Sequence, residues 1–470
     1  MKNAVGREIP DELLTGGKEV YQGKFYMDGK SYHKAGPVVR RVEKPQASKV
    51  VGSIREACER CGAHDGMTVS FHHGFRGGDY TVNMVMDVLA RMGFKNLTVA
   101  SSSLTGVHAP LVEHIKNGVV SKLYSSGLRG KLADAISAGI LKEPVQIHSH
   151  GGRVHLVKTG ELKIDVAFLG VPVCDPFGNA NGQHGQSICG SLGYAMTDAQ
   201  YADKVVLLTE AIETFPTAPH SIAQDEVDYI VPVDAVGDPA KIGADATRMT
   251  TNPRELLIAR RCAEVIAKSG YFYDGFSLQT GTGGASLAVT RFLEDKMRRD
   301  NITASFGLGG ITATMVQLHE KGLIKKLLDV QSFDADAAKS LARNPNHIEI
   351  SANQYANYSS KGASVEQLDV VVLSALEIDT GFNVNVLTGS DGVLRGASGG
   401  HCDTAANARL AIIVAPLVRG RIPTVVDEVI TCITPGEHID VLITDHGIAV
   451  NPRRPQLAQR LRDAGVELTT

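Results

Sequence analysis

Apolar segments of strand length alternate with amphipathic segments of helix length along this chain from Val50 onward. Short apolar runs bounded by turn residues are typical of buried parallel strands, and apolar residues at every third or fourth position are typical of helices that pack on a sheet. In the first half, this pattern predicts a helix at 53–61, a strand at 67–71, a glycine loop at 74–78, a helix at 80–92 and a strand at 97–100. The second half repeats the order, with a helix at 253–268, a strand at 276–279, a glycine loop at 281–284, a helix at 286–298 and a strand at 302–306.

One of the apolar runs occurs twice together with its polar flanks. Asp165, Asp175, Asn179 and Asn181 each return 204 positions later, as Asp369, Asp379, Asn383 and Asn385. The glycine pairs Gly77-Gly78 and Gly283-Gly284 are 206 positions apart, and residues 227–231 resemble residues 439–443. Three matching segments in one order indicate a duplicated α/β unit. We interpret the repeated Asp and Asn residues as twin framework elements beside a cleft and not as two active sites.

The duplication predicts two tandem, structurally similar open-sheet α/β domains with the active site at their interface. A length of 470 residues suits two domains better than one. Glycine, proline and aspartate gather at 237–252, where we place the boundary. The predicted division is an N-terminal extension at 1–49, a first domain at 50–240 and a second domain at 241–470.

Composition excludes several classes of function. The net charge is −3 and no block of basic residues occurs, which argues against nucleic acid as a partner. No apolar segment approaches the roughly 18 residues of a membrane span, so no membrane association is expected. Seven scattered cysteines suit a reducing cytoplasm, and Cys58 and Cys61 lack a second ligand pair, so no metal site is predicted.

Two glycine loops are candidate binding sites. The loop Gly281-Thr282-Gly283-Gly284 lies between a predicted strand and a predicted helix, where unpaired N–H groups and the helix N-terminus favour an anion. It departs from the dinucleotide-binding pattern, because Ser286 stands where a third glycine is required. A tight turn without a ligand is the alternative reading. The corresponding loop at 74–78 carries Arg76, which suits a carboxylate.

A third glycine-rich segment, Gly396-Ala397-Ser398-Gly399-Gly400, matches the G-x-S-x-G pattern of serine hydrolases. That pattern requires a strand before the serine, and residues 389–395 contain too many turn residues for a central strand. We therefore favour a loop whose backbone N–H groups stabilise a developing oxyanion, with no side-chain nucleophile.

Histidines and arginines also lie beside glycines at the ends of predicted strands. His72 and His73 end one strand, and alternation places His148 and His150 on one face of another. We expect these histidines to line a cleft or to hydrogen-bond in the core, because a zinc pair would need a third ligand. Arg76, Arg129 and Arg153 occupy similar positions, where open α/β sheets bind ligands, and together they favour an anionic substrate.

Five segments together resemble the citrate lyase alpha subunit family of the CoA-transferase superfamily. They are Val69–Asp79 (VSFHHGFRGGD), Ile147–Arg153 (IHSHGGR), Phe276–Ala285 (FSLQTGTGGA), Leu373–Asp379 (LSALEID) and Arg395–Asp403 (RGASGGHCD). The resemblance extends from about Gly62 to Arg454. Family members continue beyond the position of Thr470, so it also predicts a chain shortened at its C-terminus.

The resemblance implies two CoA-transferase-like domains and an acyl exchange in which acetyl-thioester and citrate give citryl-thioester and acetate. The thiol would belong to a dephospho-CoA-like group on a gamma subunit, an acyl carrier protein, or to CoA itself. A beta subunit would then cleave the citryl-thioester, within an oligomeric complex in the bacterial cytoplasm. No tightly bound cofactor of this chain is implied.

The resemblance also implies roles for residues of the glycine segments. Gly399 and Gly400, beside Ser398, would form the catalytic turn. Gly281, Thr282, Gly283, Gly284 and Ala285 would bind the pantetheine or its phosphates, and His72, His73, Arg76, Gly77 and Gly78 would bind citrate.

Many CoA transferases form a covalent thioester on a glutamate, whereas the corresponding stretch here, Ala304-Ser-Phe-Gly-Leu-Gly-Gly310, has no carboxylate. We therefore expect citrate to attack the acetyl-thioester directly and to form a mixed citric-acetic anhydride. The alternatives are a covalent-glutamate CoA transferase for a small carboxylic acid, a hydrolase that uses Ser398, and a scaffold that only binds the carrier protein. Glu377 could serve as a nucleophile, although a packed, hydrogen-bonded glutamate is the favoured reading.

Overall fold

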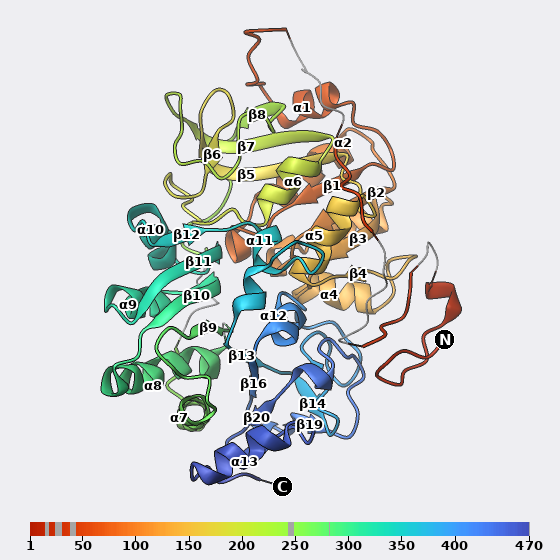
Figure 1. Cartoon of the computed structure of the whole chain (residues 1–470). Helices are drawn as coiled ribbons and strands as arrows, with labels where there is room; N and C mark the ends of the chain where they lie inside the picture. The colour runs from red at the N-terminus through yellow and green to blue at the C-terminus, as the bar shows by residue number, and fades with distance from the viewer. Residues whose placement is uncertain (15–17, 24–30, 38–43, 243–248, 282, 470) are drawn as a thin grey trace.

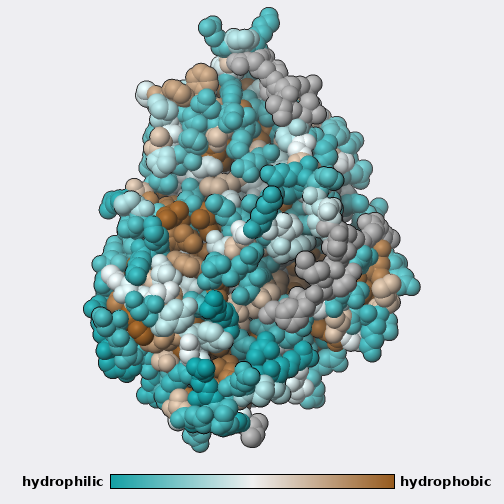
Figure 2. Space-filling model, in the orientation of Figure 1, coloured by the Kyte–Doolittle hydropathy of each residue, from teal (hydrophilic) through white to brown (hydrophobic). Residues whose placement is uncertain are grey.

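The computed structural model describes residues 1–14, 18–23, 31–37, 44–242, 249–281 and 283–469. Two eight-stranded sheets form its framework, with the first-half sheet above the second-half sheet in Figure 1. On the face drawn in Figure 2, a compact apolar area lies at the level where the two sheets meet, and most of the remaining face is hydrophilic. Within the described residues, no helix combines the length and the apolar character needed to cross a bilayer.

The first sheet has the order β4-β3-β2-β1-β5-β7-β8, and β6 pairs with β5 beside this path. Its strands are β1 (Thr68–Phe71), β2 (Leu97–Ser101), β3 (Val120–Ser125), β4 (Gln146–Ile147), β5 (Val166–Cys174), β6 (Ala180–Asn181), β7 (Lys204–Ile212) and β8 (Tyr229–Pro232). The helices of this half are α1 (Ile54–Cys61), α2 (Thr81–Arg91), α3 (Leu111–Lys116), α4 (Gly130–Ser137), α5 (His150–Thr159) and α6 (Ala195–Tyr201). All pairings along the main order are parallel, as crossover connections require.

The second sheet has the order β12-β11-β10-β9-β13-β16-β20-β21. Its strands are β9 (Ser277–Thr280), β10 (Ala304–Ile311), β11 (Ile324–Ser332), β12 (His347–Glu349), β13 (Val370–Ser374), β16 (Leu410–Val414), β20 (Val441–Ile443) and β21 (Ile448–Val450). The helices are α7 (Pro253–Lys268), α8 (Gly284–Asp300), α9 (Ala313–Glu320), α10 (Ala335–Arg343), α11 (Ala352–Ala356), α12 (His401–Asn407) and α13 (Pro455–Asp463). Short strands β14 (Glu377–Asp379), β15 (Val384–Asn385), β17 (Val418–Arg419), β18 (Ile422–Pro423) and β19 (Val425–Val426) lie outside this sheet.

The two sheets share one topology. Strand β9 takes the place of β1, β13 that of β5 and β16 that of β7, and the other parallel strands correspond in the same order. The tandem α/β architecture predicted from the repeat is therefore confirmed. The last strand of the first sheet ends at Pro232 and α7 begins at Pro253, so the predicted boundary at 237–252 falls between them. Residues 243–248 of this boundary segment lie outside the described part of the chain. The exact division into domains stays a prediction.

Helix ends follow from local sequence signals. Ser53 caps α1 by accepting a hydrogen bond from the Glu56 N–H at 3.1 Å, and Gly62 ends the helix with a φ of 71°. Asn252 caps α7, and Pro253 occupies its first turn, where a missing N–H costs nothing. The predicted and observed bounds of α7 are identical for this reason.

The repeated aspartates hold neighbouring strands together. Asp165 Oδ2 accepts a hydrogen bond from the Thr68 N–H at 2.7 Å, next to the start of β1. Asp369 Oδ2 accepts one from the Ser277 N–H at 2.9 Å, at the start of β9. Each carboxylate thus satisfies a backbone donor that would otherwise lack a partner at the edge of a buried core. This shared requirement explains why the spacing survived while most other side chains of the repeat changed.

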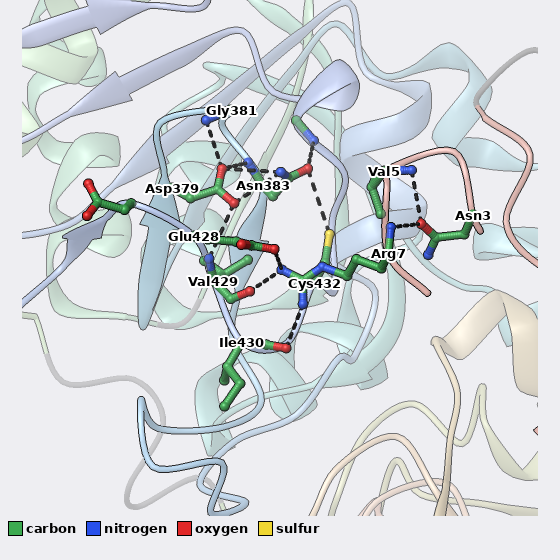
Figure 3. Close-up of polar contacts among 12 residues, drawn as sticks. Asn3, Val5, Arg7, Asp379, Gly381, Asn383, Glu428, Val429, Ile430 and Cys432 are labelled. Atoms are coloured by element: carbon green, nitrogen blue, oxygen red, sulfur yellow. Dashed lines mark hydrogen bonds and ion pairs between the residues drawn. The ribbon is translucent and has the colours of Figure 1, made fainter. Parts of the chain in front are cut away.

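The second pair of repeated residues also has a framework role. Asp175 Oδ1 accepts hydrogen bonds from backbone N–H groups of its own turn, and the Asn179 amide donates to Asp175 Oδ2 at 2.7 Å. In the second half, Asp379 accepts from the Asn383 N–H at 2.9 Å and from the Asn383 side chain, as Figure 3 shows. Both pairs therefore close tight turns, in agreement with the predicted twin framework elements.

The N-terminal extension packs on both halves of the molecule. Arg7 donates to the carbonyl oxygens of Val429 and Ile430 and lies 3.3 Å from the Glu428 carboxylate (Figure 3). Farther along, the Ala35 N–H donates to the carbonyl oxygen of Lys158, near the end of α5, at 2.7 Å. Lys49 Nζ donates to the carbonyl oxygens of Phe177 and Gln224 in the first half. The described parts of the extension therefore lie on the fold and contact the second half before the first.

Candidate active site

The carboxyl ends of strands from both sheets meet where the two halves contact each other. Gln331, near the end of β11, donates through Nε2 to the carbonyl oxygen of His73, just after β1, at 2.9 Å. The Ser398 N–H donates to the Ser126 carbonyl oxygen, just after β3, at 2.7 Å. Carboxyl ends of parallel strands are where open α/β sheets bind ligands, and here two such edges face each other. The interface therefore has the form expected of a shared active site.

Three rings gather on the first-half side of this interface. The ring centroid of His150 lies 5.6 Å from that of His73 and 4.4 Å from that of Tyr194, and His73 lies 4.6 Å from Tyr194. Desolvation lowers the pKa of His150 to about 3. Desolvation also lowers the pKa of His73 well below its usual value, and the neighbouring His150 adds to this shift. Both imidazoles are neutral at physiological pH and offer hydrogen bonds without charge.

The predicted placement of His148 and His150 on one strand face is wrong. Strand β4 ends at Ile147, and the Ser149 hydroxyl caps a helix by accepting a hydrogen bond from the Gly152 N–H at 2.9 Å. His150 is therefore the first residue of α5, while the His148 ring stacks on Tyr124 at 5.6 Å. Two glycines in the first turn disfavour a helix, but a contact from the second half offsets this cost: Asp403 Oδ2 accepts from the Gly151 N–H at 2.9 Å.

Two of the predicted citrate ligands instead make contacts within the first half of the protein. The His72 ring points into the first half: its Nε2 lies 2.7 Å from the Gly170 carbonyl oxygen, and its Nδ1 accepts from the Gly74 N–H at 3.1 Å. Both ring nitrogens are thus in use away from the interface. Gly78 packs against Asp238, whose carbonyl oxygen would lie 2.6 Å from an added Cβ. His72 and Gly78 therefore shape the loop, and we no longer assign them to citrate.

The three predicted arginines have different surroundings. Arg76 lies at the interface, with its guanidinium carbon 4.3 Å from the ring centroid of Phe333 in the second half. Arg153 is buried and pairs with both carboxylate oxygens of Asp198, at 2.6 and 2.8 Å, so it holds α5 and α6 together and is not a substrate ligand. Arg129 is exposed at the start of α4. Of the three arginines, only Arg76 stays a candidate for binding an anion. Gly77 of the same loop stays a candidate with it.

The turn at Ser398–Gly400 lies directly on α5. Gly399 has a φ of 53°, its carbonyl oxygen accepts from the His150 N–H at 2.9 Å, and an added Cβ would lie 3.6 Å from His150 Nε2. Within the described residues, the N–H groups of Gly399 and Gly400 have no hydrogen-bond acceptor. Two adjacent unpaired donors in a partly buried turn are what an oxyanion requires.

Ser398 does not have the surroundings of a hydrolase nucleophile. Its hydroxyl has Cys402 Sγ as a partner at 3.9 Å, and no histidine hydrogen-bonds to it among the residues that the structure describes. Burial raises the pKa of Cys402 to about 12, so this thiol stays protonated and unreactive. The chain upstream forms only an isolated bridge between Thr388 and Leu394 in place of a strand.

The glycine loop after β9 approaches the same turn. The Gly281 N–H donates to the Val372 carbonyl oxygen at 2.8 Å, and an added Cβ at Gly283 would lie 3.7 Å from the Ser374 hydroxyl. The Ser374 carbonyl oxygen lies 2.9 Å from Nε2 of His401, the residue after Gly400. Helix α8 begins with Gly284 and Ala285 and has no side-chain cap. The predicted ligand Thr282 lies outside the described residues.

A carboxylate already faces the start of α8. Glu255 Oε2 would lie 2.8 Å from a Cβ added at Gly284. A negative charge at this helix N-terminus would repel a phosphate. The loop therefore suits an uncharged ligand segment better than the anion that the sequence favoured.

Several residues of the site escaped the sequence analysis: Tyr194, Gln279, Gln331, Tyr355 and Asp403. None of them belongs to one of the repeated motifs, and their spacing in the chain gives no sign that they come together. Gln279 carried the clearest signal, since it is a polar residue in a buried strand immediately before a glycine loop. Asp403 is the last residue of the glycine-rich segment Arg395–Asp403, and the sequence predicted no role for it. Desolvation raises its pKa to about 6.

Five of the fourteen buried polar side-chain atoms that lack a hydrogen-bond partner in the described residues lie around these loops. Those near the interface are Ser126 Oγ, His148 Nε2, His150 Nδ1, Gln279 Oε1 and Ser286 Oγ. Unsatisfied buried polar atoms are costly, and in native proteins they commonly have a ligand or water as the missing partner. This set is the strongest structural sign of a binding site.

Three buried carboxylates near the site have hydrogen-bond partners in the protein. Glu349 accepts from the Leu192 N–H at 2.6 Å and from the Ser221 hydroxyl at 2.7 Å. Glu377 accepts from the Asn385 amide at 2.8 Å and from the Ser390 hydroxyl, which agrees with the favoured reading of a packed glutamate. Asp403 is held by Gly151, and no cluster of three potential metal ligands occurs in the described part of the chain.

Comparisons with known proteins identify the family of this chain. A family model described as citrate lyase, alpha subunit, matches residues 47–470. The citrate lyase alpha chain of Haemophilus influenzae is 73% identical over 446 residues, which are 93% of this chain and 89% of the relative. That of Escherichia coli is 73% identical over 430 residues, with 92% and 84% covered.

Solved structures show the same relationship. A crystal structure of the alpha subunit of citrate lyase from Streptococcus mutans, in complex with citrate, matches with a TM-score of 0.96 and 54% identity, and covers 100% of this chain and 91% of that chain. The malonate decarboxylase alpha subunit of Acinetobacter baumannii shares the fold, with a TM-score of 0.68 at 16% identity over 89% of this chain and 88% of that chain. The family model and the curated relatives together show that this chain belongs to the citrate lyase alpha subunit family, the acyl-transferase subunits of the citrate lyase complex.

Proposed function

We propose that this subunit exchanges acetyl for citryl on a thiol by direct reaction between two substrates bound together at the interface. The observation that carries the proposal is the Gly399–Gly400 turn, whose unpaired N–H groups lie beside buried polar atoms without partners. The engaged state of the nearby carboxylates supports citrate itself as the nucleophile. No covalent bond to the protein is then required.

The reaction balances in two steps. A citrate carboxylate oxygen attacks the acetyl carbonyl carbon, and the carbon–sulfur bond breaks to give a mixed citric-acetic anhydride and a thiolate. The thiolate then attacks the citryl carbonyl carbon, and acetate leaves with the bridging oxygen. Both steps pass through a tetrahedral oxyanion, so one set of hydrogen-bond donors serves both. Holding the two substrates in contact supplies the remaining rate enhancement.

Residues of both halves contribute to this scheme. Gly399 and Gly400 donate to the oxyanion, and the neighbouring Ser398 fixes the turn through its N–H. His73 and Arg76, with Gly77, bind citrate carboxylates on the first-half side. The Streptococcus mutans relative was crystallised in complex with citrate, which supports citrate as a ligand of this family.

The thioester arm enters from the second-half side. Gly281, Gly283, Gly284 and Ala285 line its path, and the nearby Glu255 carboxylate favours the uncharged pantetheine over its phosphates. The arm belongs either to acetyl-CoA or to the dephospho-CoA-like group of an acyl carrier protein, the gamma subunit. A beta subunit that cleaves the citryl-thioester completes the complex. We place this chemistry in the bacterial cytoplasm, in keeping with seven free thiols.

Incubation of the full chain with acetyl-CoA and citrate is expected to yield citryl-CoA and acetate in equal amounts, because each exchange releases one of each. Liquid chromatography with mass spectrometry measures both products, and omission of citrate is the control. A chain that forms no citryl-CoA alone, and no oxaloacetate from citrate when the beta and gamma subunits are present, would contradict the proposal and leave only a scaffold role.

A further inference from the structure

Gln279 and Tyr355 form a buried polar pair next to the catalytic turn. Gln279 Nε2 donates to the Tyr355 hydroxyl oxygen at 2.9 Å, and their exposed fractions are 8% and 3%. The amide lies against Gly309, whose φ of 101° and missing side chain leave room for it: an added Cβ would lie 2.8 Å from the amide carbon. The pair is thus fixed in one arrangement.

This pair reaches the turn through Gly400. A Cβ added there would lie 2.6 Å from the Tyr355 hydroxyl oxygen, so this oxygen lies directly against the backbone that carries the proposed oxyanion donors. Tyr355 belongs to α11, and the Ala352 N–H of that helix donates to the Gly193 carbonyl oxygen of the first half at 2.8 Å. Tyr355 therefore takes its position from both halves.

Both members of the pair have unused hydrogen-bonding capacity. The Tyr355 oxygen accepts from Gln279, and its own proton has no acceptor within the described ranges. Gln279 Oε1 is buried without a partner. Burial raises the pKa of Tyr355, so the hydroxyl keeps its proton during the reaction. One unused donor and one unused acceptor lie together beside the turn, where a ligand with both kinds of group would satisfy them.

We propose that Tyr355 is a further catalytic residue, which donates a third hydrogen bond to the oxyanion beside Gly400, and that Gln279 is the positioning residue that aims its hydroxyl. The unused Gln279 Oε1 accepts from a donor of the bound substrates, such as a hydroxyl or an amide N–H. This inference rests on the proposed exchange reaction. It adds a side-chain donor to a site that otherwise depends on backbone N–H groups.

The test is steady-state exchange between acetyl-CoA and citrate in the full chain with Tyr355→Phe, which keeps the ring and removes the donor. Loss of one oxyanion donor lowers kcat by about 10²-fold. The KM for citrate and the melting temperature are expected to stay close to those of the wild type, a combination that a purely structural role does not produce. Tyr229→Phe is the matched control, because Tyr229 is equally buried in β8, away from the interface.

A second variant keeps the inference testable if Tyr355→Phe does not fold. Gln279→Met keeps a similar volume and removes the amide, so kcat is expected to fall by about tenfold, the effect of one lost neutral hydrogen bond, while the KM for citrate is retained. Full kcat in Tyr355→Phe, or equal losses in Tyr355→Phe and Tyr229→Phe, would overturn the inference. Absence of exchange in the wild-type chain would instead overturn the proposed function, so the two failures are distinguishable.

Discussion

Replacing Gly400 with alanine is expected to lower the kcat of acyl exchange by at least about 10²-fold. The added Cβ would lie 2.6 Å from the Tyr355 hydroxyl oxygen, well inside contact distance. Tyr355 is buried and accepts a hydrogen bond from Gln279, so we expect the turn to move instead of the ring. Its N–H groups then lose their alignment with the oxyanion. Steady-state exchange between acetyl-CoA and citrate measures the effect.

Gly362→Ala is the matched control for this substitution. An alanine at Gly362 meets no atom within 4 Å, so normal activity is expected. Thermal unfolding of both variants shows whether the fold is retained. Normal kcat in a folded Gly400→Ala variant would contradict the assignment of this turn to the oxyanion.

Replacing Arg153 with alanine is expected to destabilise the first half by about 3–5 kcal/mol. The substitution leaves the Asp198 carboxylate, which is fully buried, without its two charged hydrogen bonds. It also removes the bond from Arg153 to the Ala100 carbonyl oxygen, at 3.0 Å. Urea unfolding followed by circular dichroism measures the loss as a lower midpoint. Exchange activity should fall with it, because α5 carries His150.

The exposed pair of Arg395 and Asp391 provides the control. Their side chains are about half exposed, so Arg395→Ala should cost less than about 1 kcal/mol. Similar losses for Arg153→Ala and Arg395→Ala would show that the buried pair does not hold α5 in place.

The sequence predicted the architecture well because the fold depends on features that repeat. Asp165 and Asp369 satisfy the same backbone donor in each half, and glycine loops follow the first strand of each sheet. Such requirements constrain residue type and spacing together, which makes them visible in one chain. The start of α5 was missed because its two glycines oppose a helix, and the contact that stabilises it, from Asp403, lies about 250 residues away in the chain.

Predictions of the site were less complete for a related reason. The glycine segments were found, since a backbone donor site needs glycine whatever surrounds it. Side chains such as Tyr355 and Gln279 come together only through the packing of the two halves, and no spacing in the chain records that contact. His72 was assigned to citrate from the family resemblance, and Arg153 was assigned to an anionic substrate because it follows two glycines in the chain. In the fold, both side chains turn toward partners within the first half.

Direct transfer between the two bound substrates is tested by the origin of the oxygen in acetate. The full chain, in excess over acetyl-CoA, is allowed a single turnover with citrate labelled with ¹⁸O in all carboxylates. Mass spectrometry of the acetate then identifies the attacking oxygen, and unlabelled citrate in ¹⁸O-water is the control for hydrolysis.

We expect one ¹⁸O atom in each acetate of the first turnover, because the bridging oxygen of the anhydride comes from citrate. Unlabelled acetate together with citryl-CoA would contradict it, since the oxygen would then come from a carboxylate of the protein.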